Sequence, residues 1–424
     1  MASYLNGESP ARRVVVTGMG VIAANGQSLQ TFWESVRTGK SAGARITRFK
    51  VDHLPHQVGA QIENFDPSAF MSVKKAHRYE LSIQYGIAAA MLAARDSGLD
   101  MSKIDVDRVG VVEGTSIAGM ESTVKGTQAL INKGWRVMSP FTFINAYCGG
   151  GSGEIALELG VKGQVLTYCS GSASGNDAVG HAMNLIKYDE ADVMVCGGAE
   201  APIMETFWNG FCVARVMTKR NDEPTTAMKP FDTNRDGFLL GEGAAFLVLE
   251  EASHAIARGA KIYAEVAGHG RSCEAFHSVS PNPDGSGPTR AMEKALRAAR
   301  VDPSQVQYIN AHATATEGND LAETRAIKKV FGAHVKRVAV SGTKPVTGHL
   351  LGASGALESV VCALAIHKQE VPPTPNLRDP AEECDLDYVV GGSRRYPINV
   401  ALNLNSGFGG KNSCLVFKRF TEAG

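Results

Sequence analysis

The strongest constraint on the fold of this chain is an alternation of short β-branched runs with stretches of helical apolar spacing. Each run is bounded by glycine or charge, which is typical of buried strands. Strands that alternate with helices build layered α/β structures. In the first half we expect strands at residues 14–18, 109–114, 164–168, 192–198 and 244–251, and helices at 79–98 and 174–188.

The second half of the chain repeats this order. Here we expect strands at 262–270, 306–312, 337–344, 398–405 and 413–420, and helices at 289–300 and 354–369. Two βα-rich halves of similar size indicate an internal duplication, with units at 1–255 and 256–424. The 424 residues suffice for two such units, since a domain averages about 150 residues.

Charge and cysteine content exclude several classes of protein. The 43 basic and 43 acidic residues leave no chain-wide field for nucleic acid or a membrane surface. The eight cysteines have neither paired spacing nor neighbouring histidines, which argues against a disulfide scaffold and a zinc site. The N-terminus has no apolar leader, and the apolar run 87–94 is far shorter than the ~18 residues of a membrane span. We therefore expect a cytoplasmic protein without a metal.

Three predicted strands run into glycine-rich turns that carry polar side chains. The first turn holds Ser172, the second His312, and the third Lys344 and His349. Ligand sites of α/β sheets lie at the carboxyl ends of strands, so these side chains are candidates for one site. The alternative for each is an ordinary helix cap after a strand.

Together these segments resemble the β-ketoacyl-ACP synthases, the elongating type II branch of the thiolase superfamily. The resemblance covers nearly the whole chain. It is carried by RRVVVTGMG (12–20), TKRND (218–222), RDGFLLGEGAAFLVLEE (235–251), NAHATATEGND (310–320), TKPVTGHLLGASGA (343–356) and NSGFGGKN (405–412). It implies an α/β thiolase-like fold with duplicated βα halves in a five-layered α/β/α/β/α arrangement. It also implies a homodimer, and no cofactor beyond the phosphopantetheine of acyl carrier protein (ACP), which brings the acyl group.

The resemblance assigns the catalytic positions. The family's nucleophilic cysteine precedes small residues and a helix, and that pattern falls on Ser172. We interpret Cys169, three residues earlier, as a core cysteine. His312 and His349 match the family's two histidines, and Lys344 and Glu323 match its supporting pair.

The resemblance also assigns substrate contacts and one departure. The pantetheine and acyl contacts it implies are Phe238, Thr314, Thr316, Gly407, Phe408 and Gly409. Phe408 is implied to lie against the malonyl carboxylate. Ser406 and Lys411 replace a phenylalanine and a threonine of the family pattern, so we expect acyl-chain gating to differ.

The serine at position 172 changes the expected reaction. A thiol titrates near ~8.5 and forms a thiolate, whereas a serine hydroxyl needs a dedicated base. Two neutral imidazoles still stabilise the enolate that forms when malonyl-ACP loses CO₂. The sequence therefore predicts decarboxylation to acetyl-ACP. It is similar to the Ser-for-Cys decarboxylases of polyketide β-branching cassettes, which supply a hydroxymethylglutaryl-CoA-synthase-like enzyme.

Three alternatives remain open. The chain could be a condensing synthase of fatty acid or polyketide assembly in which Ser172 has replaced a native cysteine by engineering. It could be a non-catalytic partner subunit such as a chain-length factor, although such subunits usually lack the histidines that this chain retains at 312 and 349. It could also transfer acyl groups through Ser172 itself.

A small basic patch is the predicted docking surface for the acidic carrier protein. The family's docking positions fall on Lys74, Lys75, Arg78, Lys219 and Arg220. The alternative is a solvated helix face, which charge runs commonly form.

Overall fold

The structure is a computed structural model that describes residues 12–422. The expectation that the N-terminus has no apolar leader falls mostly on residues 1–11, which lie outside the described residues. The central feature is one mixed sheet of eleven strands. It consists of two half-sheets, joined where β1 (Val14–Ala23) pairs antiparallel with β9 (Ala264–Cys273) over two residue pairs.

Both half-sheets have the same topology, as a duplication requires. Counted along the chain, the five strands of each half-sheet lie in the order first, fifth, fourth, second, third. The first–fifth and fifth–fourth pairs are antiparallel, and the fourth–second and second–third pairs are parallel. The first half-sheet runs β1, β8 (Gly243–Glu251), β6 (Val193–Glu200), β4 (Val109–Gly114) and β5 (Val165–Tyr168). The second runs β9, β16 (Lys411–Lys418), β15 (Val400–Gly407), β10 (Tyr308–Asn310) and β11 (Ala339–Ser341), with β13 (Asp387–Tyr388) at its edge. The division at residue 255 stays a prediction.

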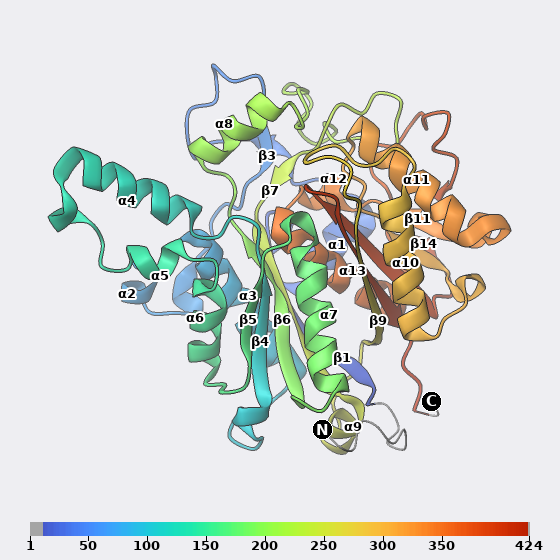
Figure 1. Cartoon of the computed structure of the whole chain (residues 1–424), viewed down its shortest axis with the longest axis horizontal. Helices are drawn as coiled ribbons and strands as arrows, with labels where there is room; N and C mark the ends of the chain where they lie inside the picture. The colour runs from blue at the N-terminus through green and yellow to red at the C-terminus, as the bar shows by residue number, and fades with distance from the viewer. Residues whose placement is uncertain (1–11, 423–424) are drawn as a thin grey trace.

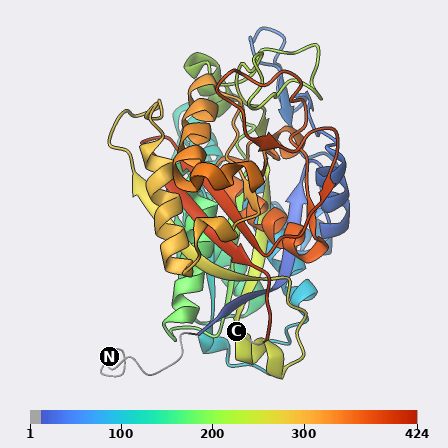
Figure 2. The ribbon, with the colours of Figure 1, turned by 90° about the vertical axis from the view of Figure 1, so that its right-hand side faces the viewer.

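Helices complete five layers, which confirms the predicted arrangement (Figure 1). The outer face of the first half-sheet is covered by α3 (Leu81–Ser97), and α7 (Ser174–Lys187) and α13 (Ser354–Lys368) lie between the two half-sheets. Figure 2 shows α10 (Ser286–Ala299) against the red strands β15 and β16. Because α13 has sheet on both sides, its residues 354–366 are all buried.

The edge strand β5 corrects two predictions. We expected a buried strand here, but Val165 and Leu166 are 38% and 39% exposed. Cys169, which follows the strand, is exposed and is not a core cysteine. The reason is that, among the strands of residues 12–422, β5 pairs only with β4 and has no neighbour on its other side.

Among the described residues, nine of the thirteen α-helices were not predicted; the longer ones are α1 (Leu29–Thr38), α4 (Met120–Lys133), α6 (Gly150–Leu159), α8 (Glu205–Ala214) and α11 (Glu317–Phe331). Figure 1 shows α4 projecting from the body of the molecule. Within residues 12–422, no helix has the length and apolar character needed to cross a membrane.

Candidate active site

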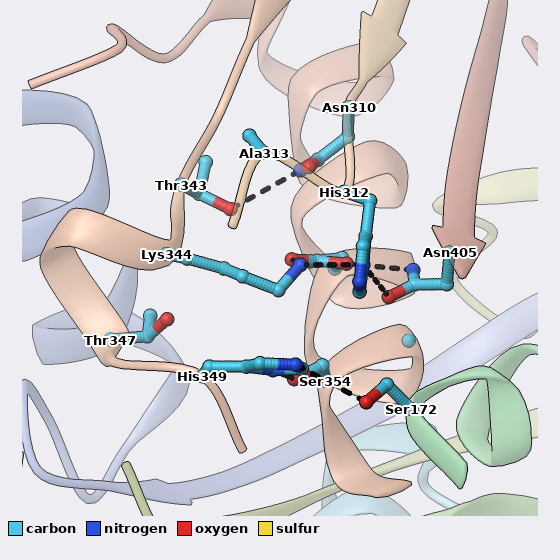
Figure 3. A network of polar contacts seen from close by, with 12 residues as sticks. Ser172, Asn310, His312, Ala313, Thr343, Lys344, Thr347, His349, Ser354 and Asn405 are labelled. Carbon is cyan, nitrogen blue, oxygen red and sulfur yellow. Dashed lines mark hydrogen bonds and ion pairs between the residues drawn. The ribbon is translucent and has the colours of Figure 1, made fainter. Parts of the chain in front are cut away.

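The three predicted turns meet at one cavity of about 210 Å³. Ser172 lies in a short 3₁₀ turn, η5 (Gly171–Ala173), that leads into α7. His312 follows β10, and His349 lies just after α12 (Lys344–Thr347). All three side chains line the cavity (Figure 3). The structure thus brings together the three catalytic positions predicted from the sequence.

His349 links Ser172 to a residue that the sequence did not point to. Its Nε2 lies 3.2 Å from Ser172 Oγ, and its Nδ1 lies 2.9 Å from Ser354 Oγ (Figure 3). The rings of Phe238 and His312 meet the His349 ring edge to face, with centroids at 5.1 and 5.3 Å. The imidazole is therefore held by contacts on several sides.

His312 belongs to a buried polar network. Its Nδ1 lies 3.1 Å from Asn405 Oδ1 and 3.3 Å from Lys344 Nζ. Glu358 accepts from both of these neighbours, from Lys344 Nζ at 2.6 Å and from Asn405 Nδ2 at 2.7 Å. The buried ammonium is thus paired with a carboxylate, as a buried charge requires.

Glu323 and Lys344, the two predicted supporting residues, support His312 through separate contacts. The Glu323 carboxylate accepts the backbone N–H of His312 at 2.6 Å and that of Ala313 at 2.8 Å. The ion-pair partner of Lys344 is Glu358, one turn into α13. Glu323 therefore holds the backbone of the histidine turn, and burial raises the pKa of its carboxyl to about 7.

Both histidines are neutral at neutral pH. Burial, and then the nearby Lys344 ammonium, hold the pKa of His312 and of His349 well below 6.5. A neutral imidazole carries one N–H donor and one acceptor nitrogen. The site therefore offers two uncharged donors beside Ser172, the groups that an oxyanion or enolate needs. Within residues 12–422, no three His, Cys, Asp or Glu side chains form a metal-binding group.

The cavity wall contains most of the predicted substrate contacts. The lining includes Phe238, Thr314, Thr316, Gly407 and Phe408. Phe408 is 48% exposed, and a Cβ on Gly407 would lie 3.0 Å from the Ser172 nitrogen, so the chain passes close to the serine turn.

Gly409 is an exception among the predicted contacts. It lies in the turn before β16, and the neighbouring Gly410 lines the cavity in its place. The sequence also missed Phe207 and Phe211 of α8, whose rings form an apolar wall. Their pattern alone does not distinguish a cavity wall from core packing.

The predicted docking residues differ in their surroundings. Lys74 and Lys219 are exposed and form no ion pair within the described residues. Lys75 and Arg220 form ion pairs with nearby carboxylates, and the Arg78 guanidinium lies over an aromatic ring. Lys74 and Lys219 are therefore the members whose charge is most available to a partner.

Comparison with known proteins agrees with this geometry. Residues 11–255 match the family model "Beta-ketoacyl synthase, N-terminal domain" and residues 263–378 match "Beta-ketoacyl synthase, C-terminal domain". The chain is 42% identical to 3-oxoacyl-[acyl-carrier-protein] synthase 2 of Synechocystis sp. over 409 residues, 96% of this chain and 98% of that protein.

Two solved structures are similar over the whole chain. The ishigamide ketosynthase/chain length factor has a TM-score of 0.91 at 31% identity, and covers 97% of this chain and 100% of the matched chain. A type II polyketide ketosynthase, bound to a hexaketide and in complex with its acyl carrier protein, has a TM-score of 0.89 at 33% identity with the same coverage. With two histidines at one cavity and a thiolase-like fold, this chain belongs to the beta-ketoacyl synthase family of enzymes.

Proposed function

We propose that this chain converts malonyl-ACP to acetyl-ACP and CO₂. The observation that carries the proposal is a serine at position 172 beside two buried, neutral histidines that face the same cavity. Serine is a weak nucleophile without a base, whereas imidazole N–H groups stabilise an enolate. The chain retains the groups that decarboxylation needs and lacks the thiol that would accept an acyl chain.

The proposed reaction places the thioester oxygen between the Nε2–H groups of His312 and His349. The bond from the methylene carbon to the carboxylate breaks, CO₂ leaves, and the electron pair forms an enolate whose charge lies on the thioester oxygen. The two N–H groups donate more strongly to this charge than to the neutral carbonyl, so they stabilise the transition state. A solvent proton on the methylene carbon then gives acetyl-ACP. The apolar ring of Phe408 disfavours the carboxylate beside it.

The proposed partner is ACP, whose phosphopantetheine would pass Thr314, Thr316 and Phe408 at the cavity wall. The similar ketosynthase solved with its carrier protein supports this partner. Delivery of acetyl-ACP to a hydroxymethylglutaryl-CoA-synthase-like enzyme for polyketide β-branching stays a prediction.

The proposed assembly is a homodimer formed through the edge strand β5. Within the described part of the chain no strand pairs with the outer edge of β5, and its residues Val165 and Leu166 are exposed. Natural proteins rarely leave such an edge open. Antiparallel pairing of two β5 strands about a two-fold axis would continue the sheet between subunits.

A second candidate is condensation, which the similarity to 3-oxoacyl-[acyl-carrier-protein] synthase 2 favours. The apolar wall of Phe207 and Phe211 also offers space for an acyl chain. This reading requires Ser172 to accept an acyl group, or to stand in place of a native cysteine. Its product would be a 3-oxoacyl-ACP.

The test is to incubate the protein with malonyl-ACP and measure the mass of the carrier. We expect acetyl-ACP, a loss of rate of at least ~100-fold in His312→Ala and in His349→Ala, and a retained rate in Ser172→Ala. His367→Ala, a histidine outside the cavity, is the matched control. Unchanged malonyl-ACP would support a non-catalytic subunit, and 3-oxoacyl-ACP formed with an added acyl-ACP would support condensation.

A further inference from the structure

We infer that Ser354 is a positioning residue that holds His349 with its proton on Nε2, an inference that rests on the proposed decarboxylation. Ser354 is the first residue of α13 and is 2% exposed. Its Oγ lies 2.9 Å from His349 Nδ1, whereas Ser172 Oγ lies near the other ring nitrogen, Nε2.

The hydrogen bonds of Ser354 select one tautomer of His349. Among the described residues, His349 Nδ1 is the one hydrogen-bond partner of the Ser354 hydroxyl. If Nδ1–H donated to the hydroxyl, the hydroxyl proton would be buried without an acceptor, which is unfavourable. If the hydroxyl donates to Nδ1, its proton is satisfied. The second arrangement leaves the ring proton on Nε2.

The ring has little freedom to exchange its two nitrogens. The His349 backbone N–H donates to the Leu239 carbonyl at 2.7 Å, and its carbonyl accepts from the Gly241 N–H at 3.0 Å. The Phe238 ring packs against the imidazole edge to face. Since backbone and ring are both held, the tautomer depends on what Nδ1 meets, and Nδ1 meets Ser354.

The other histidine lacks such a selective neighbour. His312 Nδ1 lies beside a donor, Lys344 Nζ, and an acceptor, Asn405 Oδ1. Either tautomer of His312 therefore finds a partner. At His349 the Ser354 hydroxyl alone selects the tautomer, so the single substitution Ser354→Ala tests the inference.

The tautomer decides which chemistry the pair of Ser172 and His349 performs. With the proton on Nε2, His349 donates toward Ser172 Oγ, 3.2 Å away, and toward a thioester oxygen when substrate is bound. The same nitrogen then has no lone pair to take the Ser172 proton. Ser354 thus favours enolate stabilisation and leaves the serine without a general base.

The first experiment reads the tautomer directly. In protein labelled at the histidine nitrogens, long-range nitrogen–proton spectra separate protonated from unprotonated ring nitrogens, and His349→Ala assigns the signal. We expect a protonated Nε2 in the unmodified protein and a mixture of tautomers in Ser354→Ala. Turnover in Ser354→Ala should fall on the order of tenfold in kcat with KM unchanged, as expected for one lost hydrogen bond.

Two further variants separate positioning from packing. Ser354→Thr keeps the hydroxyl and should restore most of the rate and the Nε2–H signal. Ser359→Ala removes another buried hydroxyl of α13, which donates to the Gly355 carbonyl, accepts from Asn403 Nδ2 and does not contact a histidine. It should leave the tautomer unchanged. A loss in Ser359→Ala equal to that in Ser354→Ala would overturn the inference.

In the variant Ser354→Asp we expect the opposite tautomer of His349, with the proton on Nδ1. A carboxylate at this position accepts from Nδ1–H, so the Nε2 lone pair faces the Ser172 hydroxyl. In that variant the Ser172 proton moves to Nε2, Oγ bonds to the thioester carbon of acetyl-ACP, the carbon–sulfur bond breaks, and the carrier thiol leaves with the proton. We expect an acetyl ester on Ser172, seen as added protein mass, and a ~100-fold slower decarboxylation.

The readouts distinguish failure of this inference from failure of the proposed function. A protonated Nδ1 in the unmodified protein, or an unchanged tautomer in Ser354→Ala, would overturn the role of Ser354 whatever the activity. An Nε2–H signal that depends on Ser354, in a protein that does not decarboxylate malonyl-ACP, would overturn the proposed function and leave the tautomer assignment standing.

Discussion

Lys344 influences the charge of both catalytic histidines from one side of the site. Its ammonium contacts His312 Nδ1, pairs with Glu358, and contributes to the low pKa of both imidazoles. A positively charged imidazole would stabilise the malonyl carboxylate and slow its loss. Keeping both rings uncharged therefore favours decarboxylation.

This role predicts that the two histidines add no pH dependence to the rate. Because both pKa values lie well below 6.5, neither imidazole should take up a proton between about pH 6 and 8. The double variant Lys344→Met/Glu358→Gln removes the ammonium without leaving an unpaired carboxylate, so both pKa values rise. Its rate should fall ~3- to 10-fold from pH 8 to 6. Protonation of either His312 or His349 between pH 6 and 8 in the unmodified protein would contradict neutral imidazoles.

The sequence predicts the reacting groups and two of their supports, Lys344 and Glu323, and misses two others, Ser354 and Glu358. Ser172, His312 and His349 follow from motifs that end strands. Ser354 and Glu358 act through the start of α13, and their contacts depend on how that helix packs against the histidine turns. Spacing along the chain does not encode that packing.

Among the elements, β4 and α6 meet at a buried carboxyl group that the proposed chemistry does not use. Glu113 of β4 is 2% exposed, and its Oε2 has no hydrogen-bond partner among the described residues. A Cβ on Gly151 of α6 would lie 2.4 Å from this oxygen, so glycine is needed for the helix to approach. Burial, and then the nearby Glu200, raise the pKa of Glu113 to about 8.

The raised pKa predicts how stability changes with pH. Between about pH 5 and 8 the folded chain keeps a proton on Glu113 that the unfolded chain has lost, so the free energy of unfolding falls as pH rises. Glu113→Gln should be more stable than the unmodified protein at pH 8.5 by roughly 1–2 kcal/mol, with a smaller difference at pH 5. Thermal unfolding at both pH values measures this, and the exposed Glu293→Gln is the control. An equal difference at both pH values would contradict the assignment.

Two helices with a buried apolar face, α3 and α7, could be predicted, whereas α4 could not. The expected helix at 79–98 corresponds to α3, and that at 174–188 to α7, within two residues at each end. In α4 the large apolar residues Leu130 and Ile131 are 46% and 76% exposed. Apolar periodicity signals a helix when one face packs on a core, and α4 has no such face within this chain.

The whole molecule is expected to be a homodimer, because the edge strand β5 can pair with β5 of a second copy. Val165→Arg puts a charge on β5 and should weaken the homodimer at least tenfold. Val213→Arg, at an 83% exposed valine of α8, should leave the dimer intact. Light scattering over a range of concentrations measures both variants. A monomeric unmodified protein would contradict pairing through β5.

Docking of the acidic carrier protein should depend on the exposed charges of Lys74 and Lys219. Lys74→Glu combined with Lys219→Glu should lower kcat/KM for malonyl-ACP about 5- to 10-fold at low salt, since charge complementarity raises the rate of encounter. Turnover of a small malonyl-pantetheine thioester should be unchanged. Lys336→Glu, at another exposed lysine, is the control. Equal losses on both substrates would refute this docking patch.

In the proposed reaction, His312 and His349 stabilise an enolate that solvent protonates, while Ser172 stays unmodified. The most direct test is a reaction with malonyl-ACP in heavy water, followed by mass measurement of both proteins. We expect acetyl-ACP with one deuterium in the methyl group and an enzyme of unchanged mass. An acylated enzyme, or a 3-oxoacyl-ACP product, would contradict it.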